Sequence, residues 1–194
     1  HQRIIHRAAS LARQAAGKSL VFTSCGHPLA MLDPRQCPPM IVTRQRKVEL
    51  IRTLGVDYLC MVHFTPGFLR LRPEEFIDLL CSRFVPRYIV VGPNYTFGYK
   101  GAGTVEMLRG LAGRYGFSVD VPEAVCDNHG VMVSSTVIRN LIAAGAVAGA
   151  ARMLSRPVSL CGYVSIHENN RLTPDNTKIR LEVTVESGLV VPAD

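Results

Sequence analysis

The sequence lacks tryptophan and has few charged residues, and both shortages narrow what the chain can be. Aromatic residues make up 7% of it and charged residues 19%, against 47% hydrophobic residues. A chain of this composition can bury a core, so it is not intrinsically disordered. Single-strand nucleic-acid binders interleave basic with aromatic residues, and this sequence does not. We therefore expect no nucleic-acid partner.

Paired cysteines and long apolar runs are also missing. The six cysteines include no CxxC pair and lie mostly in apolar stretches. That pattern favours buried thiols in a reducing compartment over disulfides or a zinc site. No apolar run approaches the roughly 20 residues of a membrane span, and the opening segment has no signal-peptide core. We expect a cytoplasmic protein without a membrane partner, whose oligomeric state the sequence does not indicate.

The charge that is present is mostly positive. Lys and Arg number 22 against 15 Asp and Glu, which gives a net charge of +7. Such a balance suits anionic ligands. The 194 residues exceed the usual size of a single domain, so a domain of about 150 residues with an appendage is expected.

Helical and strand patterns alternate along the chain. Helices are predicted over residues 4–12, 45–54, 73–84 and 105–115, and strands over 20–23, 58–63, 88–92 and 117–121. Residues 26–39, rich in Pro and Gly, are predicted to form a loop. Alternation of this kind predicts an α/β fold, a doubly wound parallel sheet with right-handed crossovers. Ligands in such sheets bind beyond the carboxyl ends of the strands.

Residues 134–139, Ser-Ser-Thr-Val-Ile-Arg, follow an apolar run and open a further predicted helix. A helix start presents unpaired N–H groups and the positive end of the dipole, which can hold a phosphate. The planar guanidinium of Arg139 could reach a polyphosphate with two N–H groups. Ser134 is equally suited to be an ordinary N-cap. Spacing alone supports capping and phosphate binding about equally.

The amino-acid sequence of this segment resembles the SSTxIR signature of the nucleotidylyltransferase superfamily. Other segments resemble, in the same order, one branch of it, the prokaryotic bifunctional riboflavin kinase/FMN adenylyltransferases, or FAD synthetases. His1-Gln2 is similar to the end of that family's HxGH-Q motif, His27-Pro28 to its PHP turn, and residues 91–98 to its VGxNFxFG loop. The resemblance covers nearly the whole chain, strongly to about Gly162 and poorly afterwards.

The resemblance implies a Rossmann-like domain over residues 1–155 that transfers AMP from ATP to FMN, giving FAD and pyrophosphate. It assigns the ATP phosphates to His1, Ser134, Ser135, Thr136 and Arg139, with His1, Ser134 and Arg139 taking part in catalysis. It assigns the flavin substrate to Asn94, His27, Tyr95 and Phe97. For the two aromatic residues spacing alone favours packing in the core, and a His before Pro can serve only to fix a loop.

The sequence departs from the family at two places near these residues. The family has Phe-Asp-Pro before the PHP histidine, where this chain has Ser24-Cys25-Gly26. The family also has a strand and a first His ahead of the position of His1, and we expect that strand to precede His1 in the protein. No carboxylates are paired at metal-site spacing, so no protein metal site is predicted and Mg²⁺ is expected to be carried by the nucleotide phosphates.

Residues 156–194 resemble part of a riboflavin kinase module. The kinase carries a PTAN motif, whereas residues 173–176 here read Thr-Pro-Asp-Asn. Residues 179–186 alternate as a half-buried strand does, but two or three strands cannot close a six-stranded barrel. We expect no riboflavin kinase activity. Two alternatives to FMN adenylyltransferase stay open: an adenylyltransferase for another phosphate monoester, and a catalytically silent homologue that binds flavin or nucleotide.

Overall fold

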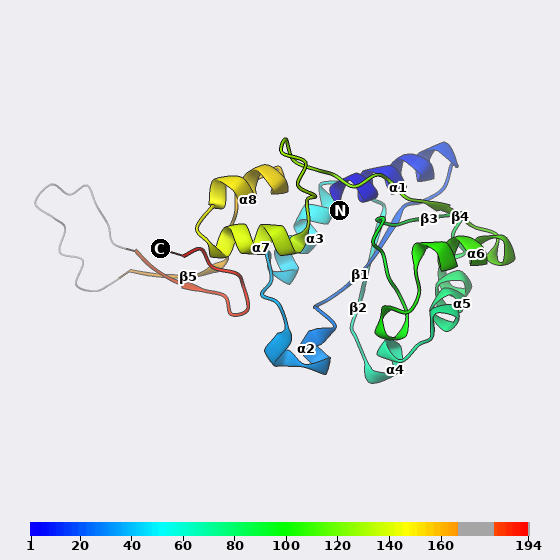
Figure 1. The fold of residues 1–194 in the computed structure, drawn as a ribbon, viewed down its shortest axis with the longest axis horizontal. Coiled ribbons are helices and arrows are strands. Elements are labelled where there is room, and N and C mark those ends of the chain that lie inside the picture. Colours follow the sequence, from blue (N-terminus) through cyan, green and yellow to red (C-terminus); the bar gives the residue numbers. More distant parts are fainter. Residues whose placement is uncertain (167–180, 194) are drawn as a thin grey trace, which may run out of the picture. The chain divides into compact units, whose positions relative to one another are not determined.

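The computed structural model describes residues 1–166 and 181–193 (Figure 1). Its contacts divide the chain into two compact units, each built from two stretches of sequence. The first unit comprises His1–Cys37 and Lys47–Val125, and the second comprises Pro38–Arg46 and Cys126–Asp194. A domain boundary between residues 155 and 156 therefore stays a prediction.

The first unit alternates helices with parallel strands. Its elements are α1 (Gln2–Gln14), β1 (Leu20–Ser24), α2 (Leu29–Leu32), η1 (Pro34–Gln36), α3 (Arg44–Arg52, which begins in the second unit), β2 (Tyr58–Val62), α4 (Pro66–Leu69), α5 (Pro73–Phe84), β3 (Tyr88–Val90), η2 (Tyr99–Gly101), α6 (Val105–Tyr115) and β4 (Ser118–Asp120). The predicted helices over 73–84 and 105–115 are confirmed with the same bounds, and the other predicted elements are present with ends shifted by a residue or two.

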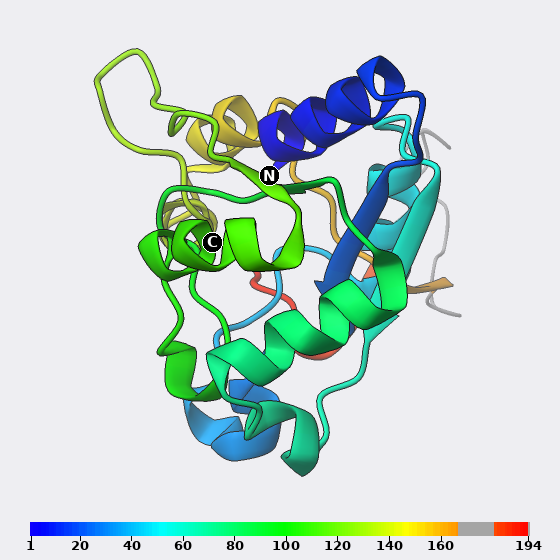
Figure 2. The ribbon, with the colours of Figure 1, turned by 90° about the vertical axis from the view of Figure 1, so that its right-hand side faces the viewer.

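The strands of the first unit form parallel pairs. β1 pairs with β2, with Leu20 opposite Tyr58, and β3 pairs with β4, with Tyr88 opposite Ser118. Figure 2 shows β1 and β2 side by side in blue and cyan. The α/β fold class is as predicted, but the described strands of the first unit form two separate parallel pairs rather than one continuous sheet.

Side chains from α5, α6 and the loop after β3 form the core of the first unit. Ile77 and Leu108 are the most deeply buried of them, at 1% and 0% exposed. The Phe76 ring lies 5.7 Å from that of Phe97 and 6.0 Å from that of Phe22, measured between centroids. Each such side chain contributes roughly 1.5–3 kcal/mol when fully buried. This core fixes the loop that follows β3 against α5.

The second unit contains an antiparallel strand pair and two helices that contact each other. Its elements are α7 (Ser135–Ala143), α8 (Val147–Leu154), β5 (Gly162–Ile166) and β6 (Leu181–Val185). Ile138, Ile142, Ala150 and Val190 form its core. β6 confirms the described part of the strand that is predicted over residues 179–186. Residues 173–176, with the altered kinase motif, lie outside the described residues.

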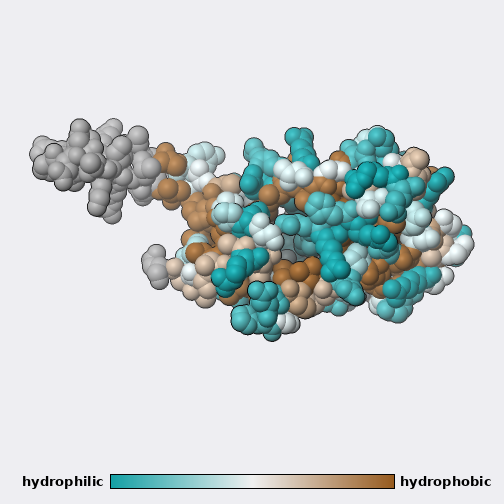
Figure 3. All heavy atoms as spheres, turned by 90° about the horizontal axis from the view of Figure 1, so that it is seen from above, coloured by the Kyte–Doolittle hydropathy of each residue, from teal (hydrophilic) through white to brown (hydrophobic). Residues whose placement is uncertain are grey.

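Residues 38–46 join the second unit through the backbone. Met40 donates its N–H to the Gly188 carbonyl at 2.6 Å and accepts from the Val190 N–H at 2.9 Å. Hydrophilic residues are spread over the face of the molecule shown in Figure 3, with smaller hydrophobic areas between them. Within the described part of the chain, no helix has both the length and the apolarity needed to cross a bilayer.

Candidate functional site

The segment 134–139 forms the start of α7 in the second unit. Ser134 has an extended backbone, and its Oγ accepts the Val137 N–H at 3.3 Å, so it is the N-cap of the helix. The Ser134 carbonyl accepts the Ile138 N–H at 3.0 Å, which is the first bond of the helical ladder. Ser135 is half-buried and Thr136 exposed in the first turn. The capping role is thus confirmed, and the role of all three hydroxyls at a phosphate stays a prediction.

Arg139 lies one turn further along α7 and is half-buried. Its Nε donates to the Pro39 carbonyl at 2.6 Å. This bond ties α7 to residues 38–46 within the second unit. The bond uses one of the five guanidinium N–H groups of Arg139, so the other four remain able to donate to a phosphate. Binding of a polyphosphate by Arg139 stays a prediction.

A closed loop leads into α7. The Asp127 carboxylate accepts hydrogen bonds from the N–H groups of His129 and Val131, each at 2.9 Å. The backbones of Cys126 and Met132 form an isolated antiparallel β-bridge. The bond from Val131, followed by that from His129, holds the pKa of Asp127 below its usual range. The sequence pattern alone assigns Asp127 no role. The signal for it was the local Asp-Asn-His-Gly run, because an Asp side chain commonly bonds the backbone two residues on.

In the first unit, the turn after β1 carries His27. The Cys25 N–H donates to the Val62 carbonyl at 2.9 Å, which continues the parallel pairing of β1 with β2 past Ser24. The Ser24 hydroxyl donates to the Gly26 carbonyl at 2.7 Å. His27 Nδ1 accepts the Leu29 N–H at 3.2 Å. A neutral His27 therefore carries its proton on Nε2.

Lys47, on α3, reaches the same end of β1. Its Nζ donates to the Ser24 carbonyl at 2.9 Å, and the side chain is half-buried. Lys47 is not among the site residues predicted from the sequence. Lys47 belongs to a small basic cluster, residues 44–47. The sequence of this cluster does not indicate that the Lys47 side chain is half-buried while Arg44 is exposed.

The loop after β3 carries Asn94, Tyr95 and Phe97. Asn94 is exposed. The ring of Tyr95 stacks on that of Phe97 with 5.8 Å between centroids, and Phe97 is 5% exposed. Burial raises the pKa of Tyr95 to about 12, so its phenol stays neutral at physiological pH. Both rings pack into the core, which leaves Phe97 little surface for a ligand; their contact with a flavin stays a prediction.

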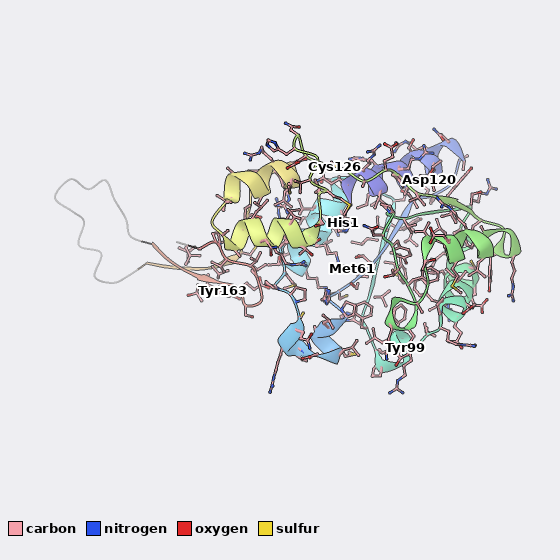
Figure 4. The ribbon with its side chains drawn as sticks, viewed as in Figure 1. His1, Met61, Tyr99, Asp120, Cys126 and Tyr163 are labelled. Atoms are coloured by element: carbon pink, nitrogen blue, oxygen red, sulfur yellow. The ribbon has the colours of Figure 1, made fainter. Side chains whose placement is uncertain are left out.

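His1, labelled in Figure 4, stands directly before α1. The residue is exposed. Its carbonyl accepts the Ile5 N–H at 3.0 Å, while its side chain does not cap the helix. Arg7 of α1 donates to the Asp120 carboxylate of β4 at 2.7 Å and so anchors the helix that carries His1.

The structure distributes the predicted site residues over both units. His1, His27, Asn94, Tyr95 and Phe97 lie in the first unit, and Ser134, Ser135, Thr136 and Arg139 lie in the second. The shared role of the two groups in one reaction stays an implication of the family resemblance. In the described residues no three His, Cys, Asp or Glu side chains gather as a metal-binding group.

The arrangement of parallel strands and crossing helices is that of a nucleotidylyltransferase-like α/β protein. A crystal structure titled as a macrolide-efflux protein from Streptococcus pneumoniae superposes with a TM-score of 0.84 at 27% identity, covering 100% of this chain and 62% of that one. A family model described as FAD synthetase matches residues 1–137. The chain belongs to the FAD synthetase family.

Curated relatives support the same family. The bifunctional riboflavin kinase/FMN adenylyltransferase of Listeria monocytogenes is 32% identical over 174 residues, which are 88% of this chain and 54% of the relative. The protein of the same name from Escherichia coli is 28% identical over 165 residues, 82% of this chain and 52% of the relative. The chain thus spans about half the length of these relatives.

Proposed function

We propose that this chain is an FMN adenylyltransferase. A phosphate oxygen of FMN attacks the α-phosphorus of ATP, the bond from that phosphorus to the bridging oxygen breaks, and pyrophosphate leaves with the electron pair. The products are FAD and pyrophosphate. The observation that carries the proposal is the match of residues 1–137 to the FAD synthetase family, whose signature segment is here the capped start of α7.

The chemistry requires positioning and charge neutralisation rather than a covalent nucleophile. The start of α7 supplies backbone N–H groups and the positive end of a helix dipole, with Ser134, Ser135 and Thr136 as further hydrogen-bonding groups. Arg139 supplies a fixed positive charge to the triphosphate, and His1 donates to the leaving pyrophosphate. Asn94 and His27 hold the flavin substrate, beside Tyr95 and Phe97.

Mg²⁺ enters this proposal with the nucleotide. The described residues gather no carboxylate cage that could bind the ion alone, and Mg²⁺ commonly keeps waters and binds substrate phosphates. The ion, carried on ATP, would supply part of the charge neutralisation at the phosphates.

Two other functions are tested by the same experiment. The turn Ser24-Cys25-Gly26 lacks the acidic residue that the family has before the PHP histidine. This change favours either an adenylyltransferase that acts on a different phosphate monoester or a catalytically silent homologue. Titration with FMN, followed by flavin fluorescence with and without ATP and Mg²⁺, distinguishes them. Binding of FMN with formation of FAD supports the proposal. ATP binding without FMN binding points to another phosphate monoester, and binding of both without product points to a silent homologue.

A further inference from the structure

Lys47 differs from the other lysines that the structure describes. Lys18 is exposed and ion-paired with Asp57, its Nζ 2.9 Å from the carboxylate. Lys100 is exposed, with its Nζ 5.4 Å from the centroid of its neighbour's ring, that of Tyr99. Lys47 is half-buried, and its hydrogen bond is to a neutral acceptor, the Ser24 carbonyl. Within the described residues no carboxylate is paired with the Lys47 ammonium.

A half-buried cation without a counter-charge is costly. An ammonium group has three donors, and a single carbonyl meets the need of only one of them. Loss of hydration lowers the pKa of Lys47, and the nearby Cys25 thiol acts in the opposite direction. Buried charges are normally paired with an opposite charge, so the position of the Lys47 ammonium suits an anionic ligand.

The position of the ammonium indicates which kind of anion. Ser24 and Val62 stand opposite each other as the last residues of the parallel pair of β1 and β2. Ligands of α/β folds bind beyond the carboxyl ends of parallel strands. The Lys47 ammonium thus lies at the ligand-binding end of β1, on the carbonyl of the residue three positions before His27.

We propose that Lys47 binds a phosphate group of the substrates. The inference rests on the proposed function for the identity of those substrates, because FMN and ATP both carry phosphate. The Ser24 carbonyl holds Nζ in place, and the remaining N–H groups donate to phosphate oxygens. No bond is made or broken at Lys47.

The test compares ligands that differ only in phosphate. Affinities for FMN and riboflavin are measured by flavin fluorescence, and those for ATP and adenosine by calorimetry, in wild type, Lys47→Met and Lys47→Arg. Lys18→Met is the matched control, since it removes the same charge at the opposite end of β1. A hydrogen bond to a charged group contributes substantially to the free energy of binding. Lys47→Met is therefore expected to weaken FMN or ATP binding about ten- to hundredfold.

Affinity for riboflavin and adenosine should be unchanged in Lys47→Met, and Lys47→Arg should retain most of the affinity for the phosphate ligands. A loss confined to FMN assigns Lys47 to the flavin phosphate, and one confined to ATP assigns it to the nucleotide. Equal losses for the ligands without phosphate, or no loss for any ligand, would overturn the proposal.

A second measurement needs no variant. Acetylation of the wild-type protein, followed by mass spectrometry, should show Lys47 protected by FMN or ATP but not by riboflavin or adenosine, with Lys18 unaffected. Unchanged Lys47 acetylation would contradict the proposal. The same experiments distinguish failure of the proposed function from failure of this inference. If Lys47 binds phosphate ligands but no FAD forms, the proposed function is wrong and the role of Lys47 is supported. If FAD forms but Lys47→Met leaves all affinities unchanged, the role of Lys47 is wrong and the proposed function is supported.

Discussion

At the scale of single residues, the hydrogen bonds of Ser134 and Arg139 define what α7 can still offer a ligand. The Ser134 oxygen accepts the Val137 N–H, but its own O–H remains able to donate. Arg139 uses Nε on the Pro39 carbonyl, which orients the guanidinium plane before any ligand arrives. A preoriented donor costs less to engage than a mobile one. Capping and phosphate binding are therefore compatible at this helix.

Arg139→Ala is expected to lower the rate strongly and the stability slightly. Loss of a preorganised charge at the phosphates should cost about 2–4 kcal/mol of transition-state stabilisation. Loss of the bond to Pro39 should cost about 0.5–1.5 kcal/mol of unfolding free energy. Initial rates and thermal melts measure both, and Ser134→Ala serves for comparison because its loss of a cap should lower the melting temperature. Unchanged turnover in Arg139→Ala would remove Arg139 from the phosphate site.

Asn94→Ala is expected to weaken FMN binding and leave both stability and ATP binding nearly unchanged. Asn94 is exposed, so its truncation does not disturb the core. A lost hydrogen bond to the flavin should cost about 0.5–1.5 kcal/mol, or up to about 3 kcal/mol if its partner is charged. FMN titration of wild type and variant measures the effect, with the exposed Asn128→Ala as a control of the same chemical change. Equal FMN affinity in Asn94→Ala and wild type would exclude Asn94 from the site.

Sequence reasoning reached the residues whose partners are local. Ser134 as N-cap follows from a bond to the third residue along. The bond from Arg139 to Pro39 joins residues 100 positions apart, and that from Lys47 to Ser24 joins residues 23 apart. No local pattern encodes either, since both depend on how distant segments pack. The sequence motifs thus predicted which residues are candidates for the site, but not the contacts that those residues make.

At the scale of elements, Ser19 and Asp57 set the register of β1 against β2. The Asp57 carboxylate accepts from the Ser19 N–H at 2.9 Å and the Ser19 hydroxyl at 2.8 Å, and the Asp57 N–H donates back to Ser19 Oγ at 3.0 Å. Lys18 adds an ion pair to the same carboxylate. These bonds lie directly before both strands and align Leu20 with Tyr58.

The Ser19–Asp57 contact predicts a loss of stability in acid. The bond from the Ser19 N–H, with those from Lys18 and the Ser19 hydroxyl, holds the pKa of Asp57 well below its usual range. A carboxyl whose pKa is lower in the folded state stabilises the fold above its unfolded pKa of about 3.9, and that stability is lost as pH falls toward the folded value. Melting temperature followed from pH 7 into acid should fall more steeply in wild type than in Asp57→Asn. Parallel curves would contradict the assignment.

Gly98 fixes the loop after β3 against the start of α5. Its φ is +74°, and a Cβ there would lie 2.7 Å from the backbone nitrogen of Pro73. Gly98→Ala is therefore expected to destabilise the protein by about 1–3 kcal/mol. Gly116→Ala is the matched control, because Gly116 has a φ of +75° but no atom near the added Cβ. Denaturant unfolding should show a clearly larger loss for Gly98→Ala, and equal losses would show that the contact with Pro73 does not matter.

Long elements with strong start signals were predictable and short ones were not. Thr104 caps α6 by accepting the Met107 N–H, and Glu75 accepts the Arg72 N–H at the start of α5. The predicted loop over residues 26–39 instead contains α2 and η1, the latter held by the Asp33 carboxylate. Helices of three or four residues have no measurable periodicity, and Pro and Gly conceal them.

At the scale of the whole molecule, the chain combines a family signature with a change in the family's motif. The alternating pattern predicted the α/β class, and the family match agrees with it. The division into two units was not predictable, because residues 38–46 join the second unit through backbone bonds to residues near the end of the chain. The family resemblance implies that an active enzyme and a silent homologue would differ at the Ser24-Cys25-Gly26 turn.

The most direct test of the central claim follows the phosphorus of ATP. Purified protein is incubated with Mg²⁺, FMN and ATP labelled at the α-phosphate or at the γ-phosphate. We predict that the α label appears in FAD and the γ label in pyrophosphate, in equal amounts, and that riboflavin in place of FMN yields no FMN. Bound FMN and ATP with neither labelled product would contradict the account.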